Sequence, residues 1–341
     1  MTRVRMLLAF TLWLVPFMAG AVDLKIATIA PENSSWMKAM REGAADIETR
    51  TDGRVKVKLY GGGVMGNDRK VLRKIRIGQL HGASFTASGL GDVYNDIHIY
   101  GLPLLFNSQE EVDYVRARMD ELFVQGLDEA GMVSFGFTGA GFARIMSNEP
   151  IRSYDDLAGK KVWVPEGDVT TIAAMEALGL SPVVLPLTDV LTALQTGLVD
   201  IVGASEVAAL VLQWHTKLKY VTDYPLIYIY ATLVIDKRYF DRLEPADQAV
   251  VREVLEGIYE EYDRQNLEDN VKATEVLKAN GITYVEPAPG AIDAWRERVA
   301  EVNRREAANG LFSEELFEQM LGLIDEYRRS AETAAVVSPA E

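Results

Sequence analysis

The sequence predicts an α/β fold of two lobes, a clamshell joined by a long bridging helix. Short apolar, β-branched segments alternate with helical segments, which is the pattern of α/β proteins. The same alternation starts again near Gly141, so we expect two bodies. A helical pattern from Pro245 to Ala279 would be ~52 Å long, more than the packing face of one domain. We therefore expect this helix either to span both bodies or to kink, and a ligand to bind in the cleft between the bodies.

In the first body, strands are expected at 24–30, 55–60, 82–87 and 132–137, and helices at 34–50, 67–77 and 108–130. In the second body, strands are expected at 144–147, 161–164, 183–185 and 199–203, and helices at 169–178 and 188–196. Asp168 and Thr188 are expected to cap these two helices, since their side chains can accept from free backbone N–H groups.

The remaining segments connect or close the two bodies. A long run at 226–235, rich in β-branched and aromatic residues, is expected to be a strand between the lobes. Pro245 suits the first turn of the long helix. Two more helices are expected at 291–308 and 313–329, followed by a small-residue tail at 330–341 that we expect to be disordered. The lobes would then comprise 22–141 plus 231–270 and 142–230 plus 271–329.

The N-terminus has the features of an export signal. Arg3 and Arg5 precede an apolar stretch from Met6 to Met18, and Ala19-Gly20-Ala21 fits a cleavage site. The apolar stretch is shorter than the ~20 residues of a spanning helix. We expect residues 1–21 to be a signal peptide cleaved near Ala21, and the mature protein to work outside the cytoplasm, in the periplasm, without inserting into the membrane.

Composition narrows the classes of function. The chain has no cysteine, which excludes disulfides, thiolate metal ligands and a thiol nucleophile. The formal charge is −15, and removal of Arg3 and Arg5 makes it about −17. An acidic chain without a basic run does not bind nucleic acid or anionic lipid through its overall charge. An anionic solute would have to be held by local groups.

Several segments in order along the chain carry a family resemblance. They are 30–36 (APENSSW), 66–69 (GNDR), 102–106 (LPLLF), 141–148 (GFARIMSN), and a long stretch from Leu157 to Asp200. Together they resemble the extracytoplasmic solute-binding subunit of TRAP transporters, the DctP family. The resemblance implies a type II periplasmic-binding-protein fold whose lobes close around a small organic solute. It also implies delivery to two TRAP membrane subunits, the small and large permease components.

The strongest departure from the family pattern is at Trp163. By resemblance, this position usually holds an arginine that grips the carboxylate of the solute. An indole offers one N–H donor and a large apolar face, whereas a guanidinium offers a bidentate fork. Trp163 alternates with Val162 and Val164, so we expect the two valines to face the core and Trp163 to face the cleft. A core tryptophan is the alternative.

Other candidate ligand-binding residues follow from the same resemblance. Ala204 stands where the family has asparagine, and Leu187 where it often has an aromatic residue. Arg144 is the remaining cationic candidate, with a surface ion pair as the alternative. Ser205 offers a hydroxyl to the ligand or a helix cap, and Tyr230 lies beside Tyr228 on the strand between lobes. The loop residues Asn33 and Ser34 complete the candidate set.

These departures favour an apolar, aromatic or amphipathic organic solute. A second hypothesis in the same fold is a small hydroxy- or keto-acid bridged by a cation to Glu166 and Asp168, although such acids are more often a cap and a solvated side chain. A third is a sensory binding protein that is not coupled to transport. Enzyme activity is the weakest hypothesis, because the sequence has no HExxH, phosphate-loop or Gly-x-Ser-x-Gly motif. We expect no cofactor.

Overall fold

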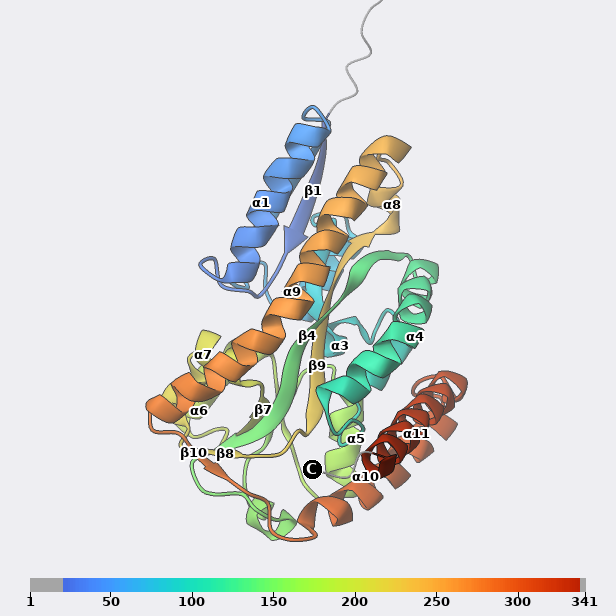
Figure 1. The fold of residues 1–341 in the computed structure, drawn as a ribbon. Helices are drawn as coiled ribbons and strands as arrows, with labels where there is room; N and C mark the ends of the chain where they lie inside the picture. Colours follow the sequence, from blue (N-terminus) through green and yellow to red (C-terminus); the bar gives the residue numbers. More distant parts are fainter. Residues whose placement is uncertain (1–20, 338–341) are drawn as a thin grey trace, which may run out of the picture.

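One mixed sheet runs through both lobes. The computed structural model describes residues 21–337, so the predicted signal peptide lies outside the described range apart from Ala21. Within that range the main sheet has eight strands in the order β10-β8-β4-β9-β3-β1-β2, and β7 also pairs with β4. At its centre, β4 (Met132–Ser147) and β9 (Ile227–Asp236) form an antiparallel pair that passes from one lobe to the other (Figure 1).

The first lobe is built on three parallel-paired strands, β1 (Val22–Ala27), β2 (Val55–Tyr60) and β3 (Gly82–Thr86). Around them lie α1 (Ser35–Arg50), α2 (Asp68–Arg76), α3 (Ala87–Leu90), η1 (Asn95–Gly101), α4 (Gln109–Glu129) and α8 (Lys237–Phe240). Ser34, Asn67 and Ser108 start the longer helices, because each side chain accepts a backbone N–H from the first turn. These bounds lie close to those predicted.

The second lobe holds shorter elements. Its strands are β5 (Trp163–Pro165), β6 (Val183–Leu185), β7 (Ile201–Ala204), β8 (Tyr220–Thr222) and β10 (Thr283–Val285). Its helices are η2 (Tyr154–Leu157), α5 (Val169–Ala177), η3 (Leu187–Asp189), α6 (Val190–Thr196), α7 (Glu206–Val211) and η4 (Trp214–Lys217).

The two helix caps expected in this lobe have different outcomes. Asp168 caps α5 by accepting from the backbone N–H of Thr171 at 3.0 Å, as predicted. Thr188 does not cap α6, because it lies inside the short turn η3 and α6 begins two residues later.

Strand β4 is longer than predicted. The glycines between Phe137 and Arg144 suggest a break in the sequence, but the structure continues as one strand with register shifts after Ser134 and Gly139. Gly136 and Gly141 have φ values of 95° and 82°, which favour glycine. Bulges of this kind increase local twist without ending the pairing. The strand can therefore join the two lobes.

Helix α9 (Pro245–Ala279) has the predicted bounds and bridges the lobes (Figure 1). Near its start, Val251, Leu255 and Tyr259 pack into the core of the first lobe, whereas Leu277 near its end packs into the core of the second. Between these ends the Asn266 amide donates to the carbonyl of Gly139 at 2.7 Å. The helix is thus fixed to the connecting strand where it crosses between lobes.

The last two helices belong to different lobes. Trp295 and Val299 of α10 (Ala291–Ala308) pack with Leu157 of the second lobe. In contrast, α11 (Glu314–Val337) packs on α4 of the first lobe, where Arg328 donates to Glu111 at 2.8 Å. The boundaries drawn from sequence place both helices in the second lobe, so the placement of α11 is a correction.

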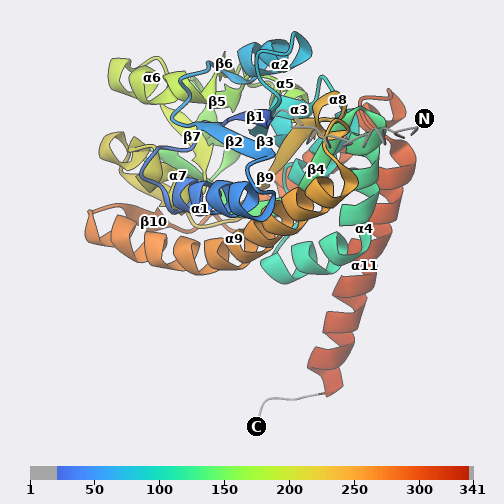
Figure 2. The same cartoon turned by 90° about the horizontal axis from the view of Figure 1, so that it is seen from above.

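Helix α11 also ends later than expected and extends away from the body of the protein (Figure 2). Residues 330–337, expected to be disordered, continue the helix in line with the high helix propensity of their alanines. The rest of the predicted tail, 338–341, lies outside the described residues.

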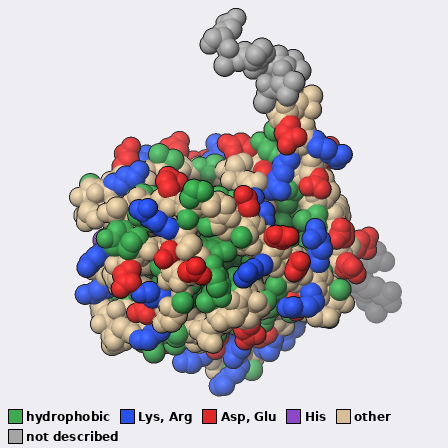
Figure 3. Space-filling model, turned by 90° about the horizontal axis from the view of Figure 1, so that it is seen from below, with side chains coloured by type: hydrophobic (Ala, Val, Ile, Leu, Met, Phe, Trp, Pro, Cys, Tyr) green, Lys and Arg blue, Asp and Glu red, His purple; other side chains and the backbone are tan. Residues whose placement is uncertain are grey.

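On the surface seen in Figure 3, Lys and Arg side chains are mixed with Asp, Glu and apolar side chains. Among residues 21–337, no helix combines the length and apolar character that crossing a bilayer requires.

Candidate ligand-binding site

A cavity of about 740 Å³ lies between the lobes. The first lobe contributes Phe85 of β3 and Pro103, and the second contributes Leu157, Met175 of α5 and Trp214 of η4. Ile227 and Ile229 of β9 line it where the lobes join. The wall is therefore largely apolar, and its size suits an organic molecule rather than a single ion.

Trp163 lines this cavity but does not offer its N–H to it. The indole N–H donates to the backbone carbonyl of Leu185 at 3.0 Å. Its ring packs edge-on against Trp214 with centroids 5.2 Å apart, and only 5% of the residue is exposed. Trp163 is thus a buried member of the core of its lobe, as in the alternative reading, and presents only a small part of its apolar ring to the cavity.

The alternation expected around Trp163 is wrong. Val164 is buried as predicted, but Trp163 is buried as well, and half-buried Val162 lines the cavity on the side expected for Trp163 alone. The reason is that β5 is covered on both faces, because Trp163 packs in one core cluster of the lobe and Val162 packs against another. The period-two rule separates core from surface only where one face of a strand is open.

Arg144 is not part of the cavity wall, contrary to expectation. Its Nε lies 2.8 Å from Glu206 Oε1, and its Nη1 pairs with Asp223. Burial raises the pKa of Glu206, and the nearby Arg144 guanidinium offsets part of this shift. Arg144 therefore compensates a buried carboxylate in its own lobe, where it is unavailable to a solute.

Glu166 lies at the mouth of the cavity and joins the two lobes. Its carboxylate accepts from the amide of Asn67 at 3.0 Å and lies 3.3 Å from Arg69, both at the start of α2 in the first lobe. Next to it, Gly167 lies against Ser88 of the first lobe. We name Asn67, Arg69, Ser88, Glu166 and Gly167 the lobe latch, and it is closed in this structure.

The remaining predicted residues divide into lining and non-lining positions. Leu187 and Ala204 line the cavity, as do Ser34 and Ser205. Both serine hydroxyls cap helices, because Ser34 accepts from Met37 and Ser205 from Ala208, each at 3.3 Å. Asn33 is exposed and lies outside the wall.

Tyr228 and Tyr230 lie on one face of β9, as expected, and both line the cavity. Their rings stack with centroids 6.0 Å apart, but their hydroxyls differ. The Tyr228 hydroxyl accepts from Arg116 at 3.1 Å, whereas the buried Tyr230 hydroxyl has no hydrogen-bond partner among the described residues. Burial raises the pKa of both phenols, so both stay protonated at neutral pH.

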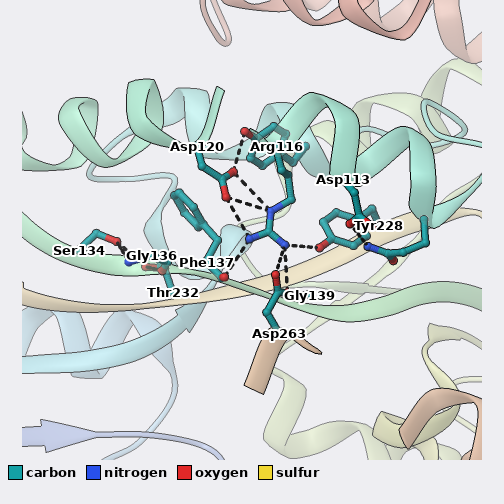
Figure 4. A network of polar contacts seen from close by, with 12 residues as sticks. Asp113, Arg116, Asp120, Ser134, Gly136, Phe137, Gly139, Tyr228, Thr232 and Asp263 are labelled. Carbon is teal, nitrogen blue, oxygen red and sulfur yellow. Dashed lines mark hydrogen bonds and ion pairs between the residues drawn. The ribbon is translucent and has the colours of Figure 1, made fainter. Parts of the chain in front are cut away.

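Arg116 joins the elements around the crossing between lobes (Figure 4). From α4, its guanidinium donates to Asp120 at 3.0 Å, to the carbonyl of Phe137 in β4 at 2.9 Å and to Asp263 in α9 at 2.8 Å. Burial of this site raises the pKa of Asp120 despite the neighbouring cation. The sequence alone does not reveal this network, because its members lie far apart in the chain.

Three polar residues of the wall were also missed. His98 of η1 is buried, and burial lowers its pKa. Asp68 of α2 has its pKa raised to about 6, first by burial and then by the charge of Glu166. Asp92 lies in the loop before η1. No local motif marks these residues, since each is brought to the cavity by the fold.

The cation-bridging hypothesis gains no support from this geometry. The described residues contain no group of three or more His, Cys, Asp or Glu side chains arranged to hold a metal ion. Glu166 already bonds to Asn67 and Arg69, and Asp168 caps α5.

Known proteins are similar to this chain in sequence and in fold. The family model described as bacterial extracellular solute-binding protein, family 7, matches residues 26–309. The C4-dicarboxylate-binding periplasmic protein DctP of Rhodobacter capsulatus is 26% identical over 85% of this chain and 87% of its own. A solute-binding protein of Verminephrobacter eiseniae is 28% identical over 79% of this chain and 80% of its own.

Solved structures agree on the fold. The sugar acid binding protein of Advenella mimigardefordensis, in complex with galactonate, has a TM-score of 0.80 at 21% identity and covers 90% of this chain and 99% of its own. A receptor of Bordetella pertussis that binds pyroglutamic acid has a TM-score of 0.81 at 18% identity, covering 89% and 100%. The family match spans most of the chain and the cavity lies between two lobes. The protein therefore belongs to family 7 of the bacterial extracellular solute-binding proteins, the TRAP transporter receptors of the DctP type, and is not an enzyme.

Proposed function

We propose that this protein is the receptor of a TRAP transporter for a predominantly apolar organic solute, aromatic or amphipathic in character. Its lobes would close around the solute and present it to the two membrane subunits. The observation that carries the proposal is Trp163, which stands at the usual arginine position and turns apolar ring surface to a largely apolar cavity.

The energetics of charge burial support this choice. A carboxylate taken out of water without a partner costs several kcal/mol. The arginine that would supply the partner is replaced, and Arg144 is occupied by Glu206 and Asp223. An apolar skeleton instead gains about 25 cal/mol for each Å² that it buries.

The relatives indicate what the same fold holds elsewhere. The Rhodobacter relative is named for C4-dicarboxylates, and a structural neighbour from Desulfovibrio salexigens contains orotic acid. We infer a different preference here because the residues at the arginine position and at Ala204 have lost their polar groups relative to the family pattern.

A ligand screen by thermal shift tests this function. Apolar and aromatic compounds should raise the melting temperature, whereas malate, succinate and fumarate should not. Strong stabilisation by the C4-dicarboxylates alone would show that the argument from Trp163 is wrong. Repeating the screen with a chelator tests cation bridging, since a bridged acid would lose its effect.

Coupling to transport needs a separate test. A strain that depends on the identified solute for growth should lose uptake when this receptor is deleted. Normal uptake with a lost transcriptional response would instead identify a sensory protein.

A further inference from the structure

One face of α9 lines the cavity where the helix crosses between the lobes. The residues of this face are Tyr262, Asn266, Asp269, Ala273 and Val276. Their alternating spacing of four and three residues places them on the same side of the helix. Asn266 lies within this row and is only 6% exposed. A buried amide needs hydrogen-bond partners for its oxygen as well as for its nitrogen.

The described chain provides partners for only the nitrogen of the Asn266 amide. Nδ2 donates to the carbonyl of Gly139 at 2.7 Å and to the hydroxyl of Thr138 at 3.3 Å. The first bond fixes the orientation of the amide, since a carbonyl can only accept. Oδ1 accepts no hydrogen bond from the described residues, and packing does not seal it off, as it does the Oδ1 of Asn270 one turn later. Oδ1 of Asn266 therefore opens into the cavity as an unpartnered acceptor.

Thr138 supplies a donor beside this acceptor. It lies on β4, is 5% exposed and lines the same cavity. Its hydroxyl oxygen accepts from Asn266, and its proton has no acceptor among the described residues. A hydroxyl has one proton and two lone pairs, so it can accept from Asn266 and donate to a ligand at the same time. Asn266 and Thr138 together thus offer one free acceptor and one free donor.

The described part of the wall offers no unpaired cation to an anionic head group. Arg69 pairs with Glu166 at 3.3 Å, and Lys272 lies 3.8 Å from Asp269. Both cationic side chains are more than half exposed, so they belong to the rim. Burial lowers the pKa of His98, so its imidazole is neutral at pH 7. Because a buried charge without a partner is costly, a neutral head group suits this wall better than an anion.

We propose that the solute carries a neutral carboxamide on its apolar skeleton, and that Asn266 and Thr138 bind this group where the chain crosses between the lobes. This inference rests on the proposed function and narrows its solute class. The N–H of the solute donates to Asn266 Oδ1, and its carbonyl accepts from the Thr138 hydroxyl. An ammonium has no acceptor for the Thr138 proton, and a ketone or a carboxylate has no donor for Oδ1. A carboxamide pairs with both.

Matched ligands separate this inference from the function it rests on. The purified receptor is titrated with series that share an aryl-alkyl skeleton and differ only at the end, such as 4-phenylbutanamide, its methyl ketone, 4-phenylbutylamine and 4-phenylbutanoate, over several chain lengths. We expect the amides to bind about tenfold more tightly than the matched ketones, amines and acids. Equal or tighter binding of another series overturns the carboxamide and leaves the apolar receptor standing. No binding by any of the series overturns both.

Variants of the two residues locate the carboxamide site. Asn266→Leu should abolish the preference for amide over ketone, because Oδ1 is lost. Thr138→Val should weaken the amide and the ketone about fivefold but not the amine, and Thr138→Ser should restore both.

The control is Asn270→Leu. Asn270 lies one turn further along α9 and also donates to a carbonyl of β4, that of Ala140 at 3.4 Å, but it lies outside the cavity wall. Its loss should leave the order of ligand affinities unchanged. If Asn266→Leu and Thr138→Val keep the order of the wild type, or weaken every ligand equally, the two residues have only a structural role and the site is refuted.

Discussion

A single guanidinium, that of Arg116, connects four elements where the chain passes between lobes. It bonds to Asp120 within α4, to β4, to the hydroxyl of Tyr228 in β9 and to Asp263 in α9. Removal of one partner from a buried ion network leaves the opposite charges uncompensated, which costs more than the network itself contributes. Arg116 is therefore a structural residue of the crossing rather than a ligand group.

We expect Arg116→Met to lower the free energy of unfolding by about 3–5 kcal/mol, because Asp120 and Asp263 lose their buried counter-charge. Urea denaturation measures the change. Arg118→Met is the control, since Arg118 is exposed two residues along α4 and stacks on Tyr114; its cost should stay below about 1 kcal/mol. Equal effects of the two variants would contradict the role given to Arg116.

Asp68 makes stability depend on pH. Its pKa is raised from 3.8 to about 6 by burial and by Glu166. Between these values the folded protein binds a proton that the unfolded chain has lost, so this contribution to stability falls as pH rises from about 4 to 6 and is constant above.

Asp68→Asn should therefore match the wild type at pH 4 and exceed its stability at pH 7, by at most about 3 kcal/mol. Chemical denaturation at both pH values measures the difference. Asp52→Asn, at an exposed position, should show no such dependence on pH. A constant difference between Asp68→Asn and the wild type at all pH values would show that Asp68 titrates normally.

At the scale of single residues, the sequence predicts which residues lie near the cavity better than it predicts what their side chains do there. Trp163 does line the cavity, but its N–H is taken by a carbonyl 22 residues away in the chain. Arg144 pairs with Glu206 and Asp223 and so does not reach the cavity. These two carboxylates are distant in the sequence, so a linear motif does not predict that they lie beside Arg144. His98 and Asp68 enter through loops and helix starts whose direction only the tertiary fold determines.

At the scale of elements, periodicity and caps predict most bounds, and the failures have local causes. Helix α9 and strands β2 and β6 have the predicted bounds, since their patterns are bounded by clear signals. The sequence predicts two strands where the structure has the single strand β4, because glycine often interrupts a strand, whereas here it forms bulges. The sequence assigns α11 to the wrong lobe. An amphipathic pattern predicts that one face of a helix is buried, but it does not predict which element buries that face.

The lobe latch depends on the contact of one glycine. Gly167 has a φ of +91°, and a Cβ there would lie 2.5 Å from the carbonyl oxygen of Ser88 in the opposite lobe. We expect Gly167→Ala to hold the lobes apart and to weaken solute binding more than tenfold, with a larger radius of gyration in small-angle scattering.

A second glycine controls for backbone strain alone. Gly159 has a φ of +72° and nothing within 4 Å of its Cβ position, so Gly159→Ala carries the strain without the clash. It should lose stability but keep its affinity. If both variants bind the solute equally, the approach of Gly167 to Ser88 does not control closure.

At the scale of the whole molecule, the two lobes share elements, and we therefore expect them to unfold together. The β4–β9 pair and α9 both contribute to the core of each lobe, and α11 returns to the first lobe after α10 has packed on the second. Closure must then bend a shared support, with the bulges at Gly136 and Gly141 as natural points of bending. The sequence predicts that an element joins the two lobes, because the helical pattern of α9 is too long for one lobe.

We expect Leu277→Ala, at the far end of α9, to lower the unfolding midpoint of both lobes together. The change removes buried side-chain volume from the second lobe and should cost about 2–5 kcal/mol. Hydrogen exchange checks it, because amides of β1 in the first lobe and of β7 in the second should lose protection equally. Val271→Ala, at an exposed position on the same helix, should change neither. Loss of protection in β7 alone would mean that the second lobe unfolds on its own, and that α9 joins the lobes without coupling their stability.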